Sequence, residues 1–217
     1  MTTANRTIAV FGATGRTGWR ICEHARAAGH SLSLLVRDAG RLSGEHAEVY
    51  AGARVATGDV LNVDDVDATI AGANAIMSAL GSDDFRAPGE TLFQGMLNIV
   101  AAAKRHGVRR IIAVAGGGVL DSPNGGLRSE QPGYPAVFAA VTVAHQGTWR
   151  ALRESGLDWT LVCTPDLTEA PRTGQFRVLA DLMPVGGKQI SRDDLAHWMI
   201  EQLDRSEYVG KRVGAAT

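Results

Sequence analysis

Apolar residues are distributed along this chain in two patterns. Some form short, nearly continuous runs, and others recur periodically through longer segments. The short runs, such as TIAVF at 7–11 and SLSLLV at 31–36, are rich in apolar and β-branched residues and predict buried strands. The longer segments carry apolar residues every three or four positions, which is typical of amphipathic helices. Together the patterns predict strands at 7–11, 31–36, 54–57, 75–80, 110–115 and 159–163, and helices at 16–28, 63–70, 88–106, 136–155 and 192–203.

Residues that favour helix ends support these boundaries. Gly29, Gly107 and Gly156 each follow a predicted helix, and Ser191 stands where the last helix begins. Two long segments, 116–135 and 164–190, show no periodic pattern, and long connections of this kind often bind ligands. We therefore expect both segments to be irregular loops on the substrate side of the fold.

Strands separated by helices predict βαβ units and an α/β fold, with a doubly wound parallel sheet covered by helices on both faces. The 217 residues suffice for one large core, so we expect a single domain over 1–217. Ligands of such sheets bind beyond the carboxyl ends of the strands. This rule selects Gly12 to Thr17, Arg37, Asp38, Asp59, Ala79, Leu80, Gly81, Ala115, Gly116, Gly117, Gly118, Thr164, Pro165 and Asp166.

A glycine-rich turn follows the first predicted strand and opens the first helix. Its residues are Gly12, Ala13, Thr14, Gly15, Arg16, Thr17 and Gly18. The spacing G-x-x-G-x-x-G is a variant of the dinucleotide fingerprint, in which the glycines allow a tight turn, close approach to a pyrophosphate and close helix packing. The turn therefore predicts a dinucleotide site, and the alternative is a tight connection without a ligand.

The end of the second strand indicates which dinucleotide binds. Arg37 stands there, and Arg16 in the glycine-rich turn offers a second positive charge. Guanidinium groups bind phosphate in forked geometry, so these residues favour the 2′-phosphate of NADP. Asp38 follows directly and leaves NAD as the alternative, because an acidic residue here accepts hydrogen bonds from a ribose 2′-hydroxyl.

Two further strand ends supply candidate cofactor residues. Asp59 follows the third strand, where its carboxylate can accept a hydrogen bond from an adenine amino group or simply form a turn. Ala79, Leu80 and Gly81 end the fourth strand, and small residues there let a cofactor lie across the sheet edge.

Composition excludes several classes of partner. The 22 basic and 23 acidic residues leave a formal net charge of -1, which gives no general attraction for nucleic acid or for an anionic membrane. The polar start at 1–6 predicts no signal peptide, and the two cysteines, Cys22 and Cys163, fit a reducing cytoplasm. The histidines show no ligand spacing, so we expect no metal site.

Several motifs together carry a resemblance to a known family. FGATGRTG at 11–18, LLVRD at 34–38, GDV at 58–60, SALGS at 78–82 and LRESGLDWTLVCTP at 152–165 resemble the NAD(P)H-binding branch of the atypical short-chain dehydrogenases. That branch includes flavin/biliverdin-IXβ reductases and NmrA-like proteins. The resemblance implies a Rossmann-type domain with a small C-terminal substrate-binding part, and hydride transfer from NADPH. It also places Val60 beside the cofactor.

The sequence departs from the usual short-chain reductase pattern. Such enzymes use a serine after the fifth strand and a Tyr-x-x-x-Lys on the next helix, in which the tyrosine passes a proton to the substrate. Aligning LRESGL at 152–157 with the family puts Val141 at the tyrosine position and His145 at the lysine position. Ala115, Gly116 and the two following glycines supply no hydroxyl, and Tyr134 begins no Tyr-x-x-x-Lys.

His145 is therefore the candidate catalytic residue. It can hydrogen-bond the nicotinamide ribose or act as a general acid near neutral pH, and the alternative is a histidine without a catalytic role. Trp149, one helical turn further, either walls a substrate pocket or packs in the core. Thr164 and Pro165 match the family's proline-containing segment beside the nicotinamide, where a hydroxyl or amide can hold the carboxamide.

Three functions remain open from the sequence. The first is an NADPH-dependent oxidoreductase that passes hydride to a small conjugated or aromatic acceptor, such as a flavin or a quinone, which takes its protons from solvent. The second is a non-catalytic NADP(H)-binding regulator of the NmrA-like type. The third is an isomerase or cyclase that uses the fold for non-redox chemistry. All three have a small-molecule ligand, and the sequence leaves the oligomeric state open.

Overall fold

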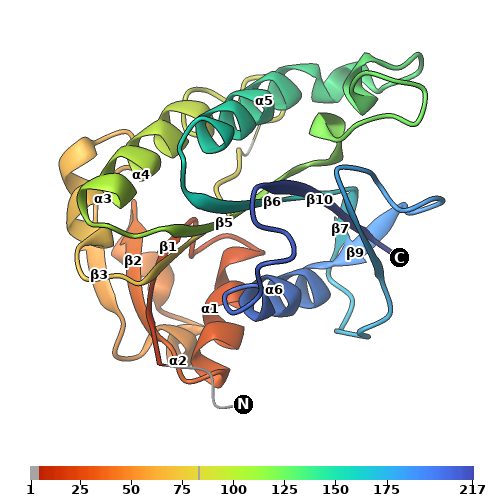
Figure 1. Cartoon of the computed structure of the whole chain (residues 1–217). Coiled ribbons are helices and arrows are strands. Elements are labelled where there is room, and N and C mark those ends of the chain that lie inside the picture. Colours follow the sequence, from red (N-terminus) through yellow and green to blue (C-terminus); the bar gives the residue numbers. More distant parts are fainter. Residues whose placement is uncertain (1–4, 83) are drawn as a thin grey trace.

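The computed structural model describes residues 5–82 and 84–217, so part of the polar start at 1–6 lies outside the described residues (Figure 1). The helices are α1 (Gly18–Ala27), α2 (Ala47–Tyr50), α3 (Val63–Ile70), α4 (Phe93–Arg105), α5 (Ala139–Arg153) and α6 (Arg192–Glu201). The strands are β1 (Thr7–Phe11), β2 (Ser31–Val36), β3 (Arg54–Thr57), β4 (Ala75–Ser78), β5 (Arg110–Gly116), β6 (Asp158–Thr164), β7 (Asp166–Thr168), β8 (Arg177–Ala180), β9 (Gln189–Ser191) and β10 (Lys211–Ala216).

The main sheet has eight strands in the order β3-β2-β1-β4-β5-β6-β10-β8. All neighbouring pairs are parallel except β10 and β8, which are antiparallel. The first six positions follow the doubly wound Rossmann order, in which the strand sequence reverses between β1 and β4. The α/β fold with a doubly wound parallel sheet is therefore confirmed, and the reversal point creates a crevice above the end of β1.

Helices cover both faces of this sheet, and each face has its own apolar core. Figure 1 shows α3, α4 and α5 on one side, with α1, α2 and α6 on the other. Ile99, Ile111 and Leu161 belong to the first core, whereas Ile21, Leu34 and Met199 belong to the second. The strands are apolar on both faces because both are buried, as expected for a parallel sheet.

Three helices begin later than the sequence pattern predicts. The helix expected from residue 136 becomes α-helical only at Ala139, after a 3-10 turn over Ala136–Phe138. The first helix of the chain starts at Gly18 instead of residue 16, because Gly12 and Gly15 close a turn through the hydrogen bond from the Gly15 amide to the Gly12 carbonyl (3.0 Å). The helix predicted from residue 88 starts at Phe93. Gly89 has a φ of +66°, which no α-helix accommodates, so the helix cannot continue back to Pro88.

The C-terminal part is more regular than expected. The segment 164–190, predicted to be irregular, contains β7, β8 and part of β9, and the chain ends in β10, which the pattern did not predict. These strands are only three to six residues long, and their burial depends on pairing with distant segments. β10 extends the main sheet beside β6, while β7 and β9 form a separate two-stranded sheet.

Among residues 5–82 and 84–217, no helix combines the length and the apolar character needed to cross a bilayer.

Candidate functional site

The glycine-rich turn sits in the crevice between β1 and β4. Gly12 has a φ of +80°, and a Cβ at this position would lie 2.5 Å from the carbonyl oxygen of Ala79. A Cβ at Gly18 would overlap the carbonyl oxygen of Gly12. The first and third glycines are therefore required by the fold itself, because a side chain at either position would push β1, β4 and α1 apart.

Gly15 differs from the other two glycines because the space beside it is open. A Cβ there would contact only the Gly12 carbonyl oxygen, at 3.3 Å. The first helical hydrogen bond runs from the Trp19 amide to the Gly15 carbonyl (3.1 Å), which leaves the amides of residues 16–18 without a helical partner. Open space beside free amides at a helix N-terminus fits the pyrophosphate of a dinucleotide.

Other residues of the turn have distinct surroundings. Ala13 is buried, and its carbonyl oxygen accepts a hydrogen bond from the buried Tyr50 hydroxyl (3.1 Å), which fixes the turn from below. Thr14 and Thr17 are half-buried, while Arg16 is exposed. Burial raises the pKa of Tyr50 to about 12, so its hydroxyl stays protonated and keeps donating this hydrogen bond.

Two arginines, Arg37 and Arg41, lie in the segment that follows β2. Arg37 follows β2 and is exposed. Arg41, which the sequence patterns did not select, donates a hydrogen bond to the Thr14 carbonyl (3.4 Å) and brings a second guanidinium to the turn. Asp38, the residue that kept NAD open, uses Oδ1 to accept the Gly40 amide (2.8 Å). The role of Arg37 at a 2′-phosphate stays a prediction.

Glu169, just after β7, draws the C-terminal part of the chain toward the glycine-rich turn. Its carboxylate pairs with Arg20 of α1 (2.8 Å) and Arg192 of α6 (2.8 Å), and Arg16 lies 3.7 Å away. The Arg16 guanidinium therefore lies near the Glu169 carboxylate. The expectation that Arg16 and Arg37 bind one phosphate together stays a prediction. No sequence pattern indicates the contacts of Glu169, because the partners lie far apart along the chain.

The residues predicted at the ends of β3 and β4 lie along the same edge of the sheet. The exposed Asp59 accepts the Leu61 amide through Oδ1 (2.9 Å) and so forms a local turn. Val60 is buried against Gly95 of α4, and its carbonyl accepts a hydrogen bond from the Asn98 side-chain amide (2.9 Å). Ala79 and Leu80 are half-buried and Gly81 is exposed. Their contacts with a cofactor remain predictions.

The ends of β5 and β6 meet beside α5. Ala115 is buried, Gly116 pairs in register with the buried Thr164, and Pro165 follows at the edge. The Gly116 amide donates a hydrogen bond to Nδ1 of His145 (3.2 Å). Because Nδ1 accepts, the neutral imidazole carries its hydrogen on Nε2, and this N–H is the group that His145 can offer to a ribose hydroxyl.

His145 is neutral at physiological pH. Burial lowers its pKa from 6.5 to about 4, because desolvation disfavours the imidazolium form. A general acid that works near pH 7 would need a higher pKa. The geometry therefore favours a hydrogen-bonding role for His145 over a proton-donating role, although its catalytic assignment remains a prediction.

We expect the imidazole of His145 not to titrate between about pH 5.5 and pH 8. The linkage follows from the lowered pKa: its stabilising contribution is complete above about pH 6.5 and is lost as the pH falls toward about 4. Histidine-selective NMR across this range would measure the titration, with His145→Gln assigning the resonance. A midpoint near 6.5 for that resonance would contradict the neutral imidazole.

Two hydroxyls reach this end of the sheet despite the missing motif. The Tyr134 hydroxyl lies 2.8 Å from the Thr142 hydroxyl and directly against Gly118, where a Cβ would overlap it. Thr142 stands one helical turn before His145 on α5. Val141, at the tyrosine position of the family pattern, is buried. Loop folding thus supplies hydroxyls that sequence spacing did not reveal.

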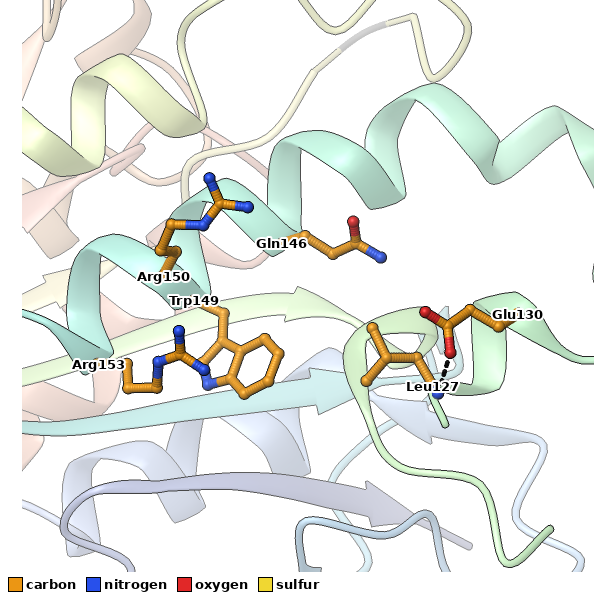
Figure 2. A pocket seen from close by; sticks show the side chains of 6 residues that line it. All are labelled: Leu127, Glu130, Gln146, Trp149, Arg150 and Arg153. Atoms are coloured by element: carbon orange, nitrogen blue, oxygen red, sulfur yellow. Dashed lines mark hydrogen bonds between the residues drawn. The ribbon is translucent and has the colours of Figure 1, made fainter. Parts of the chain in front are cut away.

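A cavity of about 240 Å³ opens between α5 and the segment that carries Leu127 and Glu130. Figure 2 shows Gln146, Trp149, Arg150 and Arg153 of α5 on one wall, and Leu127 and Glu130 on the other. The Trp149 ring also packs against the core and lies 4.0 Å from the guanidinium of Arg212. Trp149 therefore packs against the core and also lines this cavity, and its role as a wall of the substrate pocket stays a prediction.

The order of the strands and the open helix N-terminus at the glycine-rich turn define a Rossmann-type nucleotide-binding protein. A family model described as NAD(P)H-binding matches residues 12–206, and the chain belongs to this family. An uncharacterized chloroplast protein of Arabidopsis thaliana is 27% identical over 207 residues, which cover 91% of this chain and 72% of that protein.

Solved structures agree on the fold. A Burkholderia pseudomallei protein described as a candidate exported protein is 27% identical with a TM-score of 0.83, covering 98% of this chain and 100% of that one. A Streptococcus pneumoniae protein described as a candidate NADH-flavin reductase is 21% identical with a TM-score of 0.77, covering 98% and 99%. At 21% identity, the second similarity shows the fold alone.

Proposed function

We propose that this protein is an NADPH-dependent oxidoreductase that passes hydride to a small conjugated or aromatic acceptor, such as a flavin or a quinone. The observation that carries the proposal is the open space beside Gly15 at the start of α1, with Arg37 at the end of the next strand. Membership of the NAD(P)H-binding family supports the cofactor class.

The chain's own residues would hold the cofactor along the carboxyl edge of the sheet. The amides of residues 16–18 bind the pyrophosphate, and Arg37 binds the 2′-phosphate, which favours NADP over NAD. The Nε2–H of His145 donates to the nicotinamide ribose, while Thr164 and Pro165 lie where the carboxamide is expected. When bound, NADPH supplies the hydride, and the protein supplies position and exclusion of water.

The proposed acceptor class follows from the neutral His145 and the missing serine, tyrosine and lysine. A flavin or quinone accepts hydride into a delocalised system and takes its proton from water, so it needs no strong acid from the protein. The segments 116–135 and 164–190 flank this end of the sheet and would enclose such a ligand.

The direct test is NADPH oxidation followed at 340 nm with a panel of flavins and quinones. We expect steady turnover with at least one acceptor, and faster turnover with NADPH than with NADH. Tight cofactor binding without turnover across the whole panel would remove the reductase proposal but leave the cofactor site intact.

Tyr134→Phe is expected to change kcat by less than about threefold, because a solvent-protonated acceptor needs no tyrosine acid. The variant loses the hydrogen bond to Thr142 and keeps the ring, so the loop should retain its packing. The measurement is steady-state kcat with the best acceptor, with Thr142→Val as the matched variant. A loss of about a hundredfold in Tyr134→Phe alone would instead make this hydroxyl the proton donor.

The alternative is a non-catalytic NADP(H)-binding regulator. The observation that favours it is the neutral His145 beside a buried Val141, since neither provides the usual acid. A regulator would bind NADP⁺ and NADPH without turnover. If it senses the ratio of the two forms, its dissociation constants for NADP⁺ and NADPH should differ. An isomerase or cyclase would instead require His145 for activity while binding cofactor normally in His145→Ala.

A reducing compartment such as the cytoplasm is also part of the proposal. Cys22 and Cys163 are both free and buried, and burial raises the pKa of each thiol to about 12. Unpaired cysteines of this kind fit a compartment in which thiols stay reduced.

A further inference from the structure

A cluster of metal-ligating side chains lies on the surface where α1 and α6 pack together. Glu23 and His24 come from α1 and Asp193 comes from the first turn of α6, and their candidate ligand atoms all lie within 4.8 Å of one another. Nε2 of His24 is 2.5 Å from Oδ1 of Asp193. The sequence gave no sign of this group, because 169 positions separate His24 from Asp193.

The backbones that carry these side chains are fixed by the core. Ile21, Cys22 and Ala25 of α1 are fully buried, as are Leu195 and Ala196 of α6, so the two helices cannot easily move apart. Because the backbones are fixed, the three ligand side chains are already close together before an ion binds. Binding an ion therefore costs less conformational entropy.

The side chains themselves are also oriented. Oδ2 of Asp193 accepts the Arg172 amide (3.2 Å), which leaves Oδ1 directed at His24. The His197 ring stands edge-on to the His24 ring, with centroids 5.1 Å apart. The side chains of His24 and Asp193 are 17% and 28% exposed, so an ion from solvent can reach them.

We propose that Glu23, His24 and Asp193 form a Zn²⁺ site with water as the fourth ligand. One imidazole nitrogen and two carboxylate oxygens are ligand types that zinc accepts in a tetrahedral site. Zinc–ligand distances of about 2.0–2.1 Å put neighbouring ligand atoms about 3.3 Å apart. His24 and Asp193 would therefore separate slightly while Glu23 moves inward, which its exposed side chain permits.

The charges around the three ligands affect how tightly Zn²⁺ is expected to bind. Glu201 adds a third carboxylate nearby through its contact with His197 (3.7 Å). Arg172 and the N-terminus of α6 oppose a cation, whereas Arg20, one turn before His24, is paired with Glu169 (2.8 Å).

Isothermal titration calorimetry tests the site, using ZnCl₂ and chain without an affinity tag after treatment with a chelator. We expect one Zn²⁺ per chain. Glu23→Gln, His24→Ala and Asp193→Asn should each weaken binding by more than about tenfold. Glu23→Gln is the safest of the three for folding, because its side chain is exposed.

The chain contains a matched control in another histidine–aspartate pair. His106 lies 3.0 Å from Asp67, but Arg105 occupies the same carboxylate at 2.8 Å. His106→Ala should leave the zinc isotherm unchanged. Zinc should also raise the melting temperature of the unmodified chain and of His106→Ala, but not that of Glu23→Gln.

The proposal is overturned if the unmodified chain binds no zinc, or if His106→Ala weakens binding as much as His24→Ala. Retention of full affinity in Glu23→Gln would equally remove the three-ligand site. Circular dichroism of each variant checks that a loss of zinc binding does not come from unfolding. NADPH binding should be unchanged in all of these variants. The zinc proposal can therefore be wrong while the proposed reductase function is right, and the reverse.

Discussion

Gly15→Ala is expected to weaken NADPH binding by about a hundredfold, or about 2.7 kcal/mol, while the protein stays folded. The new methyl group would contact only the Gly12 carbonyl oxygen within the protein, at 3.3 Å, and would otherwise project into the space where the pyrophosphate is expected. Quenching of tryptophan fluorescence by NADPH measures the affinity, and thermal unfolding measures the stability. We expect the free energy of unfolding to change by less than about 1 kcal/mol.

Gly18→Ala is the matched control because it adds the same methyl group three residues later in the motif. There the methyl group overlaps the Gly12 carbonyl, so we expect a loss of about 1–3 kcal/mol of stability from overpacking. For a chain of this length, this corresponds to a fall in melting temperature of several degrees. Unchanged NADPH affinity in a folded Gly15→Ala protein would remove the cofactor site at this turn.

Arg37→Glu is expected to weaken NADPH binding by at least about tenfold and to change NADH binding by less than about threefold. The substitution places a carboxylate where the 2′-phosphate of NADPH is expected, whereas NADH carries only a hydroxyl there. Parallel fluorescence titrations with the two cofactors give the ratio of affinities. The site is exposed, so the variant should fold normally.

Lys104→Glu is the matched control for Arg37→Glu, because it makes the same change of charge far from the proposed site. Lys104 lies in the last turn of α4, at the end of the sheet where the parallel strands begin. If both variants lose NADPH affinity equally, the effect comes from net charge and not from a contact with the 2′-phosphate. An equal loss of NADPH and NADH affinity in Arg37→Glu would place this residue elsewhere on the nucleotide. Repeating the titrations at higher salt should shrink the difference, because an exposed ion pair is screened.

The alternating pattern of the chain was enough to predict the strands at the centre of the sheet. Buried parallel strands are apolar on both faces, so TIAVF at 7–11 and SLSLLV at 31–36 stand out from their helical neighbours. The motif around Gly12 was equally informative, because Gly12 adopts a positive φ and closes a tight turn with Gly15, three residues later. Contacts within a few residues therefore left a clear signal.

Elements whose stability comes from distant partners left no such signal. β10 pairs with β6 and β8, and its run KRVGAA has no distinctive pattern without those neighbours. Tyr134 was not predicted as a site residue because it begins no Tyr-x-x-x-Lys motif. The fold of the segment 116–135 nevertheless brings its hydroxyl to Thr142 and Gly118. The general-acid hypothesis for His145 depended on burial, which sequence spacing does not encode.

The sequence by itself determined the α/β class, the central strands and the position of the dinucleotide turn, because these follow from local periodicity and from glycine's backbone freedom. The tertiary structure alone decided the protonation of His145, the contact of Glu169 with Arg20 and Arg192, and the meeting of His24 with Asp193. Charge, burial and ligand geometry depend on side chains that only packing brings together.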